Sequence, residues 1–222
     1  SLMSPHGKTV HTSVLYKLTP FLISCALYFV LWVQEPSIFA SIISSLPTIS
    51  LAFFVANQSY SAGTWTQYSQ KILEGLMFAA VGDVLIVWPK LLLPAMVAFA
   101  ACFISYTSAF GFTPFRPLIL AIIAAVGIEI YNVLLLPCLE GIYLLVVPIY
   151  LGILGIMVWR ALSLPKWQLS TSVGSVIFFV TELFDGLDIF CSKVPNFRFL
   201  VMVTYYTAQG LIAFSVTSQE VP

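Results

Sequence analysis

The fold is decided by residues 72–110, which read ILEGLMFAAVGDVLIVW, then Pro89-Lys90, then LLLPAMVAFAACFISYTSAF. Each apolar run is close to the length of about 20 residues that a helix needs to cross a bilayer. Only Trp88, Pro89 and Lys90 separate the runs, which predicts a tight turn with an interfacial aromatic ring and a cation. Because so short a connection makes two helices antiparallel neighbours, the stretch predicts a hairpin of membrane-spanning helices.

The composition extends this prediction to the whole chain. Of its 222 residues, 60% are hydrophobic and 8% are charged, whereas a soluble domain carries about 25% charged residues. The mean hydropathy is +1.01. The formal net charge is +0 and the sequence has no basic run, so a nucleic-acid partner and a polybasic lipid-binding segment are excluded. We predict an all-α integral membrane protein.

Further apolar runs, separated by Pro, Gly or charged residues, complete a bundle of about eight transmembrane helices. The predicted spans lie near residues 18–33, 38–56, 72–88, 91–110, 117–135, 141–160, 170–190 and 198–217. We expect them to form a single transmembrane domain over residues 1–222. The first run follows Lys17 without a small-residue cleavage site, so we expect a retained span rather than a signal peptide.

The basic residues predict the orientation of the bundle. One side would hold Lys8, Lys17, Lys71, Arg116, Arg160 and Lys166, and the other side Lys90, Lys193 and Arg198. The positive-inside rule then places both termini in the cytoplasm. Cys138 and Cys191 fall on the opposite side, where an oxidising lumen is compatible with a disulfide. Cys25 and Cys102 lie inside apolar runs, where a thiol acts as a small hydrophobe.

Four carboxyls within the predicted spans stand out as candidates: Asp83, Glu129, Glu182 and Asp185. An acid at mid-membrane costs about 2.5–3.5 kcal/mol, so each one needs a partner or a function. All four fall in the outer halves of the third, fifth and seventh spans. At a rise of about 1.5 Å per residue, the first three lie roughly 8–12 Å inside the outer ends of their spans, close to one depth.

Helical spacing predicts which way these acids face. Gly75, Ala79, Gly82 and Asp83 share one face, where small residues let another helix approach closely. Three further faces carry Ser175, Phe178, Glu182 and Asp185; Tyr205 and Gln209; and Ala125, Glu129 and Asn132. We predict a water-accessible polar pocket, open toward the outer side and walled by carboxylates, a phenol and amides.

Simpler roles compete with this prediction. Asp185 lies close to an outer end, where an acid fits the membrane interface. Tyr205, Tyr206 and Gln209 fit ordinary interhelical hydrogen bonds, worth about 0.6 kcal/mol each. Asp83 fits function better, because it is deeper and glycine precedes it.

The sequence excludes several classes of enzyme. Its only histidines, His6 and His11, lie in the N-terminal tail, so an intramembrane histidine serving a nucleophile or a zinc ion is excluded. The G-x-S-x-G, P-loop and G-x-G-x-x-G patterns are also absent. What remains is carboxylate chemistry, and we expect it to need no metal or organic cofactor.

Six short motifs run in order through nearly the whole chain. They are Tyr28-Phe29-Val30-Leu31-Trp32, Val81-Gly82-Asp83, Ser108-Ala109-Phe110-Gly111, Pro137-Cys138-Leu139, Trp159-Arg160-Ala161 and Thr204-Tyr205-Tyr206-Thr207-Ala208-Gln209. In these motifs the sequence resembles the transmembrane lysoplasmalogenase family, whose bacterial members are called YhhN-like. The resemblance implies an eight-helix protein, in animals of the endoplasmic reticulum membrane, that hydrolyses the vinyl ether bond of lysoplasmalogens to a fatty aldehyde and a glycerophospho-base.

Paired carboxyls suit this chemistry. Protonation of the distal alkene carbon gives an oxocarbenium ion that water attacks, much as at the carboxyl pairs of glycosidases. The resemblance implies Asp83 and Glu182 as the catalytic pair, with either one as the proton donor and Asp185 as an alternative to Glu182. The residues expected to orient water or substrate are Tyr205, Gln209, Tyr206, Asp185 and Glu129, of which Glu129 has no counterpart in the family pattern.

Three positions depart from the family pattern. Thr181-Glu182 stands where the family usually has Ser-Asp, Phe103 where a histidine is common, and Ala79 where a serine is common. These departures keep open a membrane protein that binds or senses lysolipids without catalysis. A proton-coupled transporter using the same carboxylates as a relay is a further alternative. The expected partners are a lysophospholipid substrate and membrane lipids.

Overall fold

The computed structural model describes residues 14–63, 65–165, 168–192 and 195–220. Within these ranges the chain is all-helical, with eight helices of at least 13 residues. They are α2 (Thr19–Leu31), α3 (Ile38–Ser61), α4 (Gln67–Leu85), α5 (Leu92–Phe110), α6 (Pro117–Ile130), α7 (Tyr143–Leu162), α8 (Leu169–Gly186) and α9 (Phe197–Phe214). The all-α prediction is confirmed.

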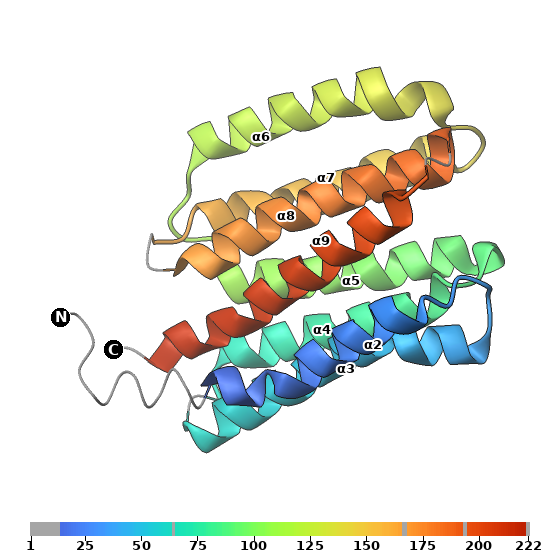
Figure 1. Ribbon diagram of the computed structural model, residues 1–222. Helices are drawn as coiled ribbons and strands as arrows, with labels where there is room; N and C mark the ends of the chain where they lie inside the picture. Colours follow the sequence, from blue (N-terminus) through green and yellow to red (C-terminus); the bar gives the residue numbers. More distant parts are fainter. Residues whose placement is uncertain (1–13, 64, 166–167, 193–194, 221–222) are drawn as a thin grey trace.

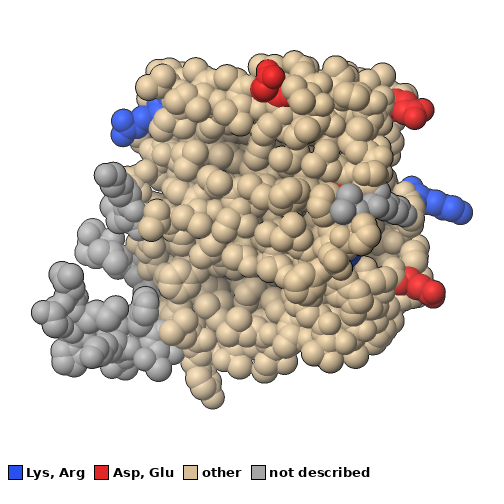
Figure 2. Space-filling model, turned by 45° about the horizontal axis from the view of Figure 1, so that its top comes forward, with Lys and Arg blue, Asp and Glu red and all other residues tan. Residues whose placement is uncertain are grey.

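The outside of the bundle is apolar, as expected of a protein solvated by lipid. Val30, Phe53 and Leu118 are 80%, 73% and 72% exposed, and Figure 2 shows a broad face that carries few charged side chains. Among the described residues, five stretches are long and apolar enough to cross a membrane: Ile38–Ser61, Pro89–Phe110, Pro117–Cys138, Tyr143–Leu162 and Phe197–Ser218. The protein is therefore an integral membrane protein built as a helix bundle.

The other three helices fall outside that group for visible reasons. α2 is apolar but only 13 residues long. α4 carries Lys71, Glu74 and Asp83, and α8 carries Glu182 and Asp185, which lower the hydropathy of both helices. Both helices that supply the candidate catalytic acids therefore fall outside the group of five because of the charged residues they carry.

Local sequence sets the ends of several helices. The Ser37 hydroxyl accepts a hydrogen bond from the Ala40 backbone N–H at 3.0 Å and caps α3. Thr66 caps α4 in the same way through the Ser69 N–H at 3.2 Å. Gly111 ends α5 with a φ of +77°, a conformation that favours glycine, and Pro117 begins α6. The apolar runs are thus punctuated by residues that satisfy or end the helical hydrogen bonds.

The predicted hairpin is confirmed by α4 and α5, which pack along each other as an antiparallel pair (Figure 1). Between them lie the turn at residues 86–88 and the short 3₁₀ helix η1 (Pro89–Leu91). A Cβ atom at Gly82 would come within 2.8 Å of the Phe99 ring, and one at Gly75 would collide with the Tyr106 ring. The small-residue face of α4 therefore serves the close approach of α5.

α6 lies at one edge of the bundle and packs on α7 (Figure 1). None of its residues is buried. Its continuation through the π-helical turn η2 (Tyr131–Leu135) and η3 (Leu136–Cys138) reaches η5 (Leu187–Cys191) beyond α8. Cys138 and Cys191 form a disulfide there, with Cα atoms 5.0 Å apart, so the pair compatible with a bridge in the sequence is bridged.

The eight helices alternate in direction, so α2 begins and α9 ends at the same end of the bundle (Figure 1). Four of the basic residues behind the orientation prediction lie at that end: Lys17, Lys71, Arg116 and Arg160. The opposite end, called the outer end below, carries Lys90, Arg198 and the disulfide. Lys8, Lys166, Lys193, His6 and His11 lie outside the described residues.

Candidate active site

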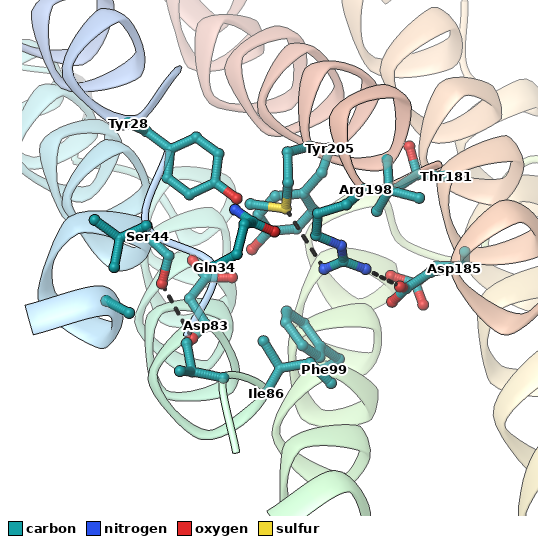
Figure 3. Close-up of a pocket in the computed structure, with 16 residues that line it drawn as sticks. Tyr28, Gln34, Ser44, Asp83, Ile86, Phe99, Thr181, Asp185, Arg198 and Tyr205 are labelled. Carbon is teal, nitrogen blue, oxygen red and sulfur yellow. Dashed lines mark hydrogen bonds and ion pairs between the residues drawn. The ribbon is translucent and has the colours of Figure 1, made fainter. Parts of the chain in front are cut away.

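A cavity of about 140 Å³ lies at the outer end of the bundle, lined by residues of α2, α3, α4, α5, α8 and α9 (Figure 3). Three carboxyls and one guanidinium line it: Asp83, Glu182, Asp185 and Arg198. Tyr28 and Tyr205 add two phenols. Acids that lie about a hundred positions apart in the chain thus meet in one polar chamber.

Asp83 is held by a hydroxyl group from another helix and lies beside a phenol from a third. It is only 3% exposed. Thr48 Oγ1 on α3 donates to Asp83 Oδ2 at 2.6 Å. The Tyr205 phenol on α9 lines the cavity beside the same carboxyl group. The Asp83 carboxyl therefore has a fixed position and direction within the cavity.

The predicted depth of Asp83 is wrong. The sequence placed it roughly 8–12 Å inside its span, on the expectation that the helix continues to Trp88. α4 ends at Leu85, two residues after Asp83, because residues 86–91 form the turn and η1. Asp83 thus lies in the last turn of α4, near the outer end of the bundle.

Glu182 and Asp185 project from α8 into the same cavity but have different partners. Glu182 Oε2 accepts a hydrogen bond from the Tyr150 hydroxyl on α7 at 3.0 Å. Asp185, one turn later, forms an ion pair with Arg198 at the start of α9. Asp185 is therefore matched to a cation, whereas a neutral phenol holds Glu182.

Three polar residues of α9 take three different positions. Tyr205 lines the cavity beside Asp83. Gln209 is fully buried behind it, donating from Nε2 to the Tyr205 oxygen at 3.3 Å and accepting from the Tyr106 hydroxyl at 2.5 Å. Tyr206 donates to the backbone oxygen of Ser44 at 2.5 Å. Tyr205 thus faces the acid, Gln209 positions Tyr205, and Tyr206 ties α9 to α3.

Glu129 does not join the cavity, which corrects its placement in the predicted pocket. It is exposed on α6, as are Ala125 on α6 and Asn132 in the following η2 turn. The opposite face of α6, with Ile123 and Gly127, is the one that turns toward α7. Helical spacing identified a real face of α6, but that face lies on the outside of the bundle.

The YhhN family model matches residues 39–216 of this chain. The chain belongs to the YhhN family. Lysoplasmalogenase TMEM86B of Homo sapiens is 36% identical over 99% of this chain and 95% of that protein. Lysoplasmalogenase TMEM86A of Homo sapiens is 33% identical over 93% of this chain and 90% of that protein. Lysoplasmalogenase TMEM86B of Sus scrofa is 35% identical over 90% and 86%. No solved structure matches the chain.

In this YhhN-family protein, the three departures from the family pattern lie close to the site. Phe103 is fully buried, with its ring edge-on to Tyr150 and Phe178 at centroid distances of 5.5 and 5.1 Å. It therefore packs against the phenol that holds Glu182. Thr181 lines the cavity and donates to Thr204 at 2.7 Å, while Ala79 is buried in α4.

Several residues of the YhhN-family cavity were not predicted. Arg198 carried a usable signal, because it and Asp185 have opposite charges at the same end of two consecutive antiparallel spans. Thr48 and Tyr150 carried none, because a hydroxyl in an apolar helix has meaning only once its neighbouring helix is known. Tyr28 and Gln34, which line the cavity, carried no such signal either.

Proposed function

We propose that this protein hydrolyses the vinyl ether bond of lysoplasmalogens to a fatty aldehyde and a glycerophospho-base. Its relatives at 33–36% identity are named lysoplasmalogenases. The observation that supports the mechanism is that Asp83 and Glu182, from α4 and α8, line one cavity together with Tyr205. A reaction that needs one proton donor and one proton acceptor requires two such carboxyl groups of the protein beside the same bound substrate.

The hydrogen bonds favour one division of roles. Asp83 accepts a short hydrogen bond of 2.6 Å from Thr48 and lies beside the Tyr205 phenol, whereas Glu182 accepts a longer one of 3.0 Å from Tyr150. Hydroxyl donors stabilise a charged carboxylate. We therefore assign Glu182 as the proton donor and Asp83 as the carboxylate that faces the cation and activates water.

The reaction then proceeds in two stages. Glu182 gives its proton to the distal alkene carbon, and the ether oxygen shares its electrons to form an oxocarbenium ion. Water adds to the carbon of that ion while its proton passes to Asp83. The resulting hemiacetal breaks its bond to the glycerol oxygen, which takes the proton from Asp83 and leaves as an alcohol. The hemiacetal hydroxyl gives its proton to Glu182 and becomes the carbonyl of the fatty aldehyde, so both carboxyls return to their starting states. Proton transfer of this kind contributes about 10²–10⁴-fold to a rate.

A second, smaller chamber with an apolar lining adjoins the polar cavity and suits only the first carbons of the hydrocarbon chain. It has a volume of about 40 Å³ and is lined by side chains such as Met96, Val147 and Phe190. It shares Glu182 and Phe99 with the polar cavity. A chain in this chamber would bring the adjoining alkene against Glu182.

The direct test is aldehyde release from a lysoplasmalogen by the purified protein. We expect Asp83→Asn and Glu182→Gln each to lower kcat by at least about 100-fold, since each removes one partner in proton transfer. The matched control is Glu129→Gln, which changes an exposed carboxyl outside the cavity and should retain activity. Unchanged turnover in both cavity variants would remove the mechanism.

The pH dependence is a second readout of the same experiment. Because one carboxyl must be protonated and the other ionised, kcat/KM should follow a bell-shaped curve. Each of the two variants should remove one limb of that curve in its residual activity. Lysolipid binding without aldehyde release would point instead to a lipid-binding protein, the alternative favoured by the burial of Phe103 where the family commonly has a histidine.

We also propose that the protein resides in the endoplasmic reticulum membrane with both termini in the cytoplasm. Lys17, Lys71, Arg116 and Arg160 lie at one end of the bundle, as the positive-inside rule requires of a cytoplasmic end. The Cys138–Cys191 disulfide lies at the other end, which fits an oxidising lumen. The candidate active site would then open on the lumenal side.

A further inference from the structure

Arg198 lines the cavity, although the hydrolysis itself uses only carboxyls and water. It lies in the first turn of α9, with its side chain 31% exposed. Nη2 pairs with Asp185, and Nη1 contacts the Met202 sulfur at 4.0 Å. A cation at a membrane-embedded site needs a partner or a function, and Asp185 accounts for only part of its bonding capacity.

The guanidinium keeps donors to spare. It carries five N–H groups, and a thioether is only a weak acceptor. Among the described residues, Asp185 is the one strong acceptor that Arg198 meets. Asp185 therefore fixes the position of the guanidinium and leaves N–H groups free for a ligand.

The surroundings of Arg198 form the polar mouth of the cavity. Gln34, in the loop between α2 and α3 at the outer end, is exposed and lines the cavity. It lies beside the Tyr28 phenol. Figure 3 shows Tyr28, Gln34 and Arg198 turned toward the same space as Asp83. The cavity thus runs from an exposed amide and a cation to buried acids.

We propose that Arg198 is a binding subsite for a phosphate group, which for the substrate is the phosphodiester of the lysolipid headgroup. The inference rests on the proposed function and names the part of the substrate that the mouth recognises. A guanidinium matches phosphate oxygens with two parallel hydrogen bonds. The amide of Gln34 and the hydroxyl of Tyr28 supply further donors beside it.

This subsite fixes the direction of the bound lipid. The phosphate stays at the outer end of the bundle, where a lysolipid headgroup lies at the membrane surface. The glycerol then extends inward, which brings the vinyl ether between Asp83 and Glu182 and the hydrocarbon chain toward the apolar chamber. A lipid bound in the reverse direction would place its phosphate among apolar side chains.

The test compares two substrates with the same alkenyl chain, a lysoplasmenylcholine and a 1-alkenylglycerol without phosphate. The wild type should show the higher kcat/KM for the phosphate-bearing lipid. Arg198→Gln should lower that preference by about tenfold or more, since it removes a charge-assisted contact. Arg198→Lys should restore part of the preference as a point charge. An equal loss on both substrates would overturn the subsite.

Arg116→Gln is the matched control, because Arg116 is exposed at the opposite end of the bundle. It should leave the substrate preference as in the wild type. Thermal melting of all variants in detergent separates misfolding from loss of the subsite. If Arg198→Gln melts early, the Arg198→Lys variant decides, because a preference that is reduced but not equal to the wild type in that variant supports the subsite, and a preference equal to the wild type overturns it.

A binding experiment keeps the subsite separate from catalysis. The probes are lysophosphatidylcholine, a monoacylglycerol of equal chain length, and inorganic phosphate. Tighter binding of the phospholipid than of the monoacylglycerol, lost in Arg198→Gln, supports the subsite even if no aldehyde is ever formed, in which case only the proposed hydrolysis fails. Competition by inorganic phosphate would show that a phosphate group alone suffices for binding at the subsite. Equal binding of both lipids by the wild type would overturn the proposal.

Discussion

Thr48 and Tyr150 each place one hydroxyl against a cavity carboxyl, at 2.6 Å from Asp83 Oδ2 and 3.0 Å from Glu182 Oε2. Neither hydroxyl takes part in the proposed bond cleavage. Both come from helices other than the one that carries the acid. Their role is to hold each carboxyl in one direction. Without such a hydrogen bond, a carboxyl side chain at a cavity would rotate freely.

Thr48→Val tests this positioning with little change in shape. A hydrogen bond to a charged group contributes about 1.5–3 kcal/mol, and about 1.4 kcal/mol is tenfold in rate. We expect kcat/KM for aldehyde release to fall by about tenfold or more. Thr48→Ser keeps the hydroxyl and should retain most of the activity.

The control for that experiment is Thr107→Val. Thr107 is also buried, but its hydroxyl donates to the backbone oxygen of Phe103 in its own helix. Aldehyde release should change little in this variant. If the valine and serine variants at position 48 lose activity equally, the hydroxyl has no positioning role.

At the scale of whole helices, the spacing of residues in the sequence showed which of them share a helix face, but not which other helix packs on that face. The step from Gly75 to Gly82 and Asp83 correctly predicted a face where another helix approaches, because glycine in an apolar helix has few other uses. The same argument failed for Glu129, whose face is exposed on the outside of the bundle. Periodicity tells which residues lie together, whereas packing decides whether protein or lipid covers them.

Helix ends were the other point that the sequence could not settle. Residues 86–88 are as apolar as the helix before them, so nothing in their composition marks the end of α4 at Leu85. The short connection to α5 requires the chain to turn there. The depth of Asp83 was therefore misjudged, although its direction was correct.

The close contact between α4 and α5 gives a prediction about stability. Gly75→Ala should destabilise the protein by about 1–3 kcal/mol, the usual range for overpacking, because the new Cβ would collide with the Tyr106 ring. Activity should fall as well, because Tyr106 holds Gln209 behind Tyr205. Thermal melting in detergent and aldehyde release measure the two effects.

Gly127→Ala is the matched control for that substitution. No atom lies within 4 Å of a Cβ built at Gly127 on α6. Alanine in a helix interior is favoured over glycine by about 0.5–1 kcal/mol, so this variant should melt at the same temperature or higher. A loss of stability equal to that of Gly75→Ala would contradict the close packing of α4 on α5.

At the end of the bundle opposite the cavity, the family motif Trp159-Arg160-Ala161 has a structural role. Arg160 Nη1 donates to the Pro114 oxygen at 2.9 Å, and its Nε donates to the Gly111 oxygen. Trp159 Nε1 donates to the Arg116 oxygen at 2.9 Å. The end of α7 thereby clamps the connection between α5 and α6. Of the family motifs, this one fixes a loop and Val81-Gly82-Asp83 supplies the site.

For the molecule as a whole, the two ends of the bundle do different work. At the end opposite the outer end, side chains hold the helices together by donating to backbone oxygens, as Arg160 does. The outer end carries the cavity, its cation and the disulfide. The sequence predicted this polarity from its lysines, arginines and cysteines, since membrane insertion and redox chemistry both depend on composition near helix ends.

The disulfide allows a test of both orientation and assembly. Cys25 and Cys102 are free, and the chain has four cysteines. Protein denatured without reduction should therefore react with maleimide at two thiols, and after reduction at four. The count is expected only if the outer end matures in an oxidising compartment. Four reactive thiols before reduction would place that end in a reducing compartment and reverse the proposed orientation.

The double substitution of Cys138 and Cys191 by serine extends the same test to stability. No residue of α6 is buried, so the bridge is the covalent tie between the outer end of that helix and the rest of the bundle. A native disulfide typically stabilises by about 2–4 kcal/mol, so the melting temperature should fall. Aldehyde release at low temperature should persist, because neither cysteine lines the cavity. A serine variant that melts like the wild type would show that packing on α7 alone holds α6 in place.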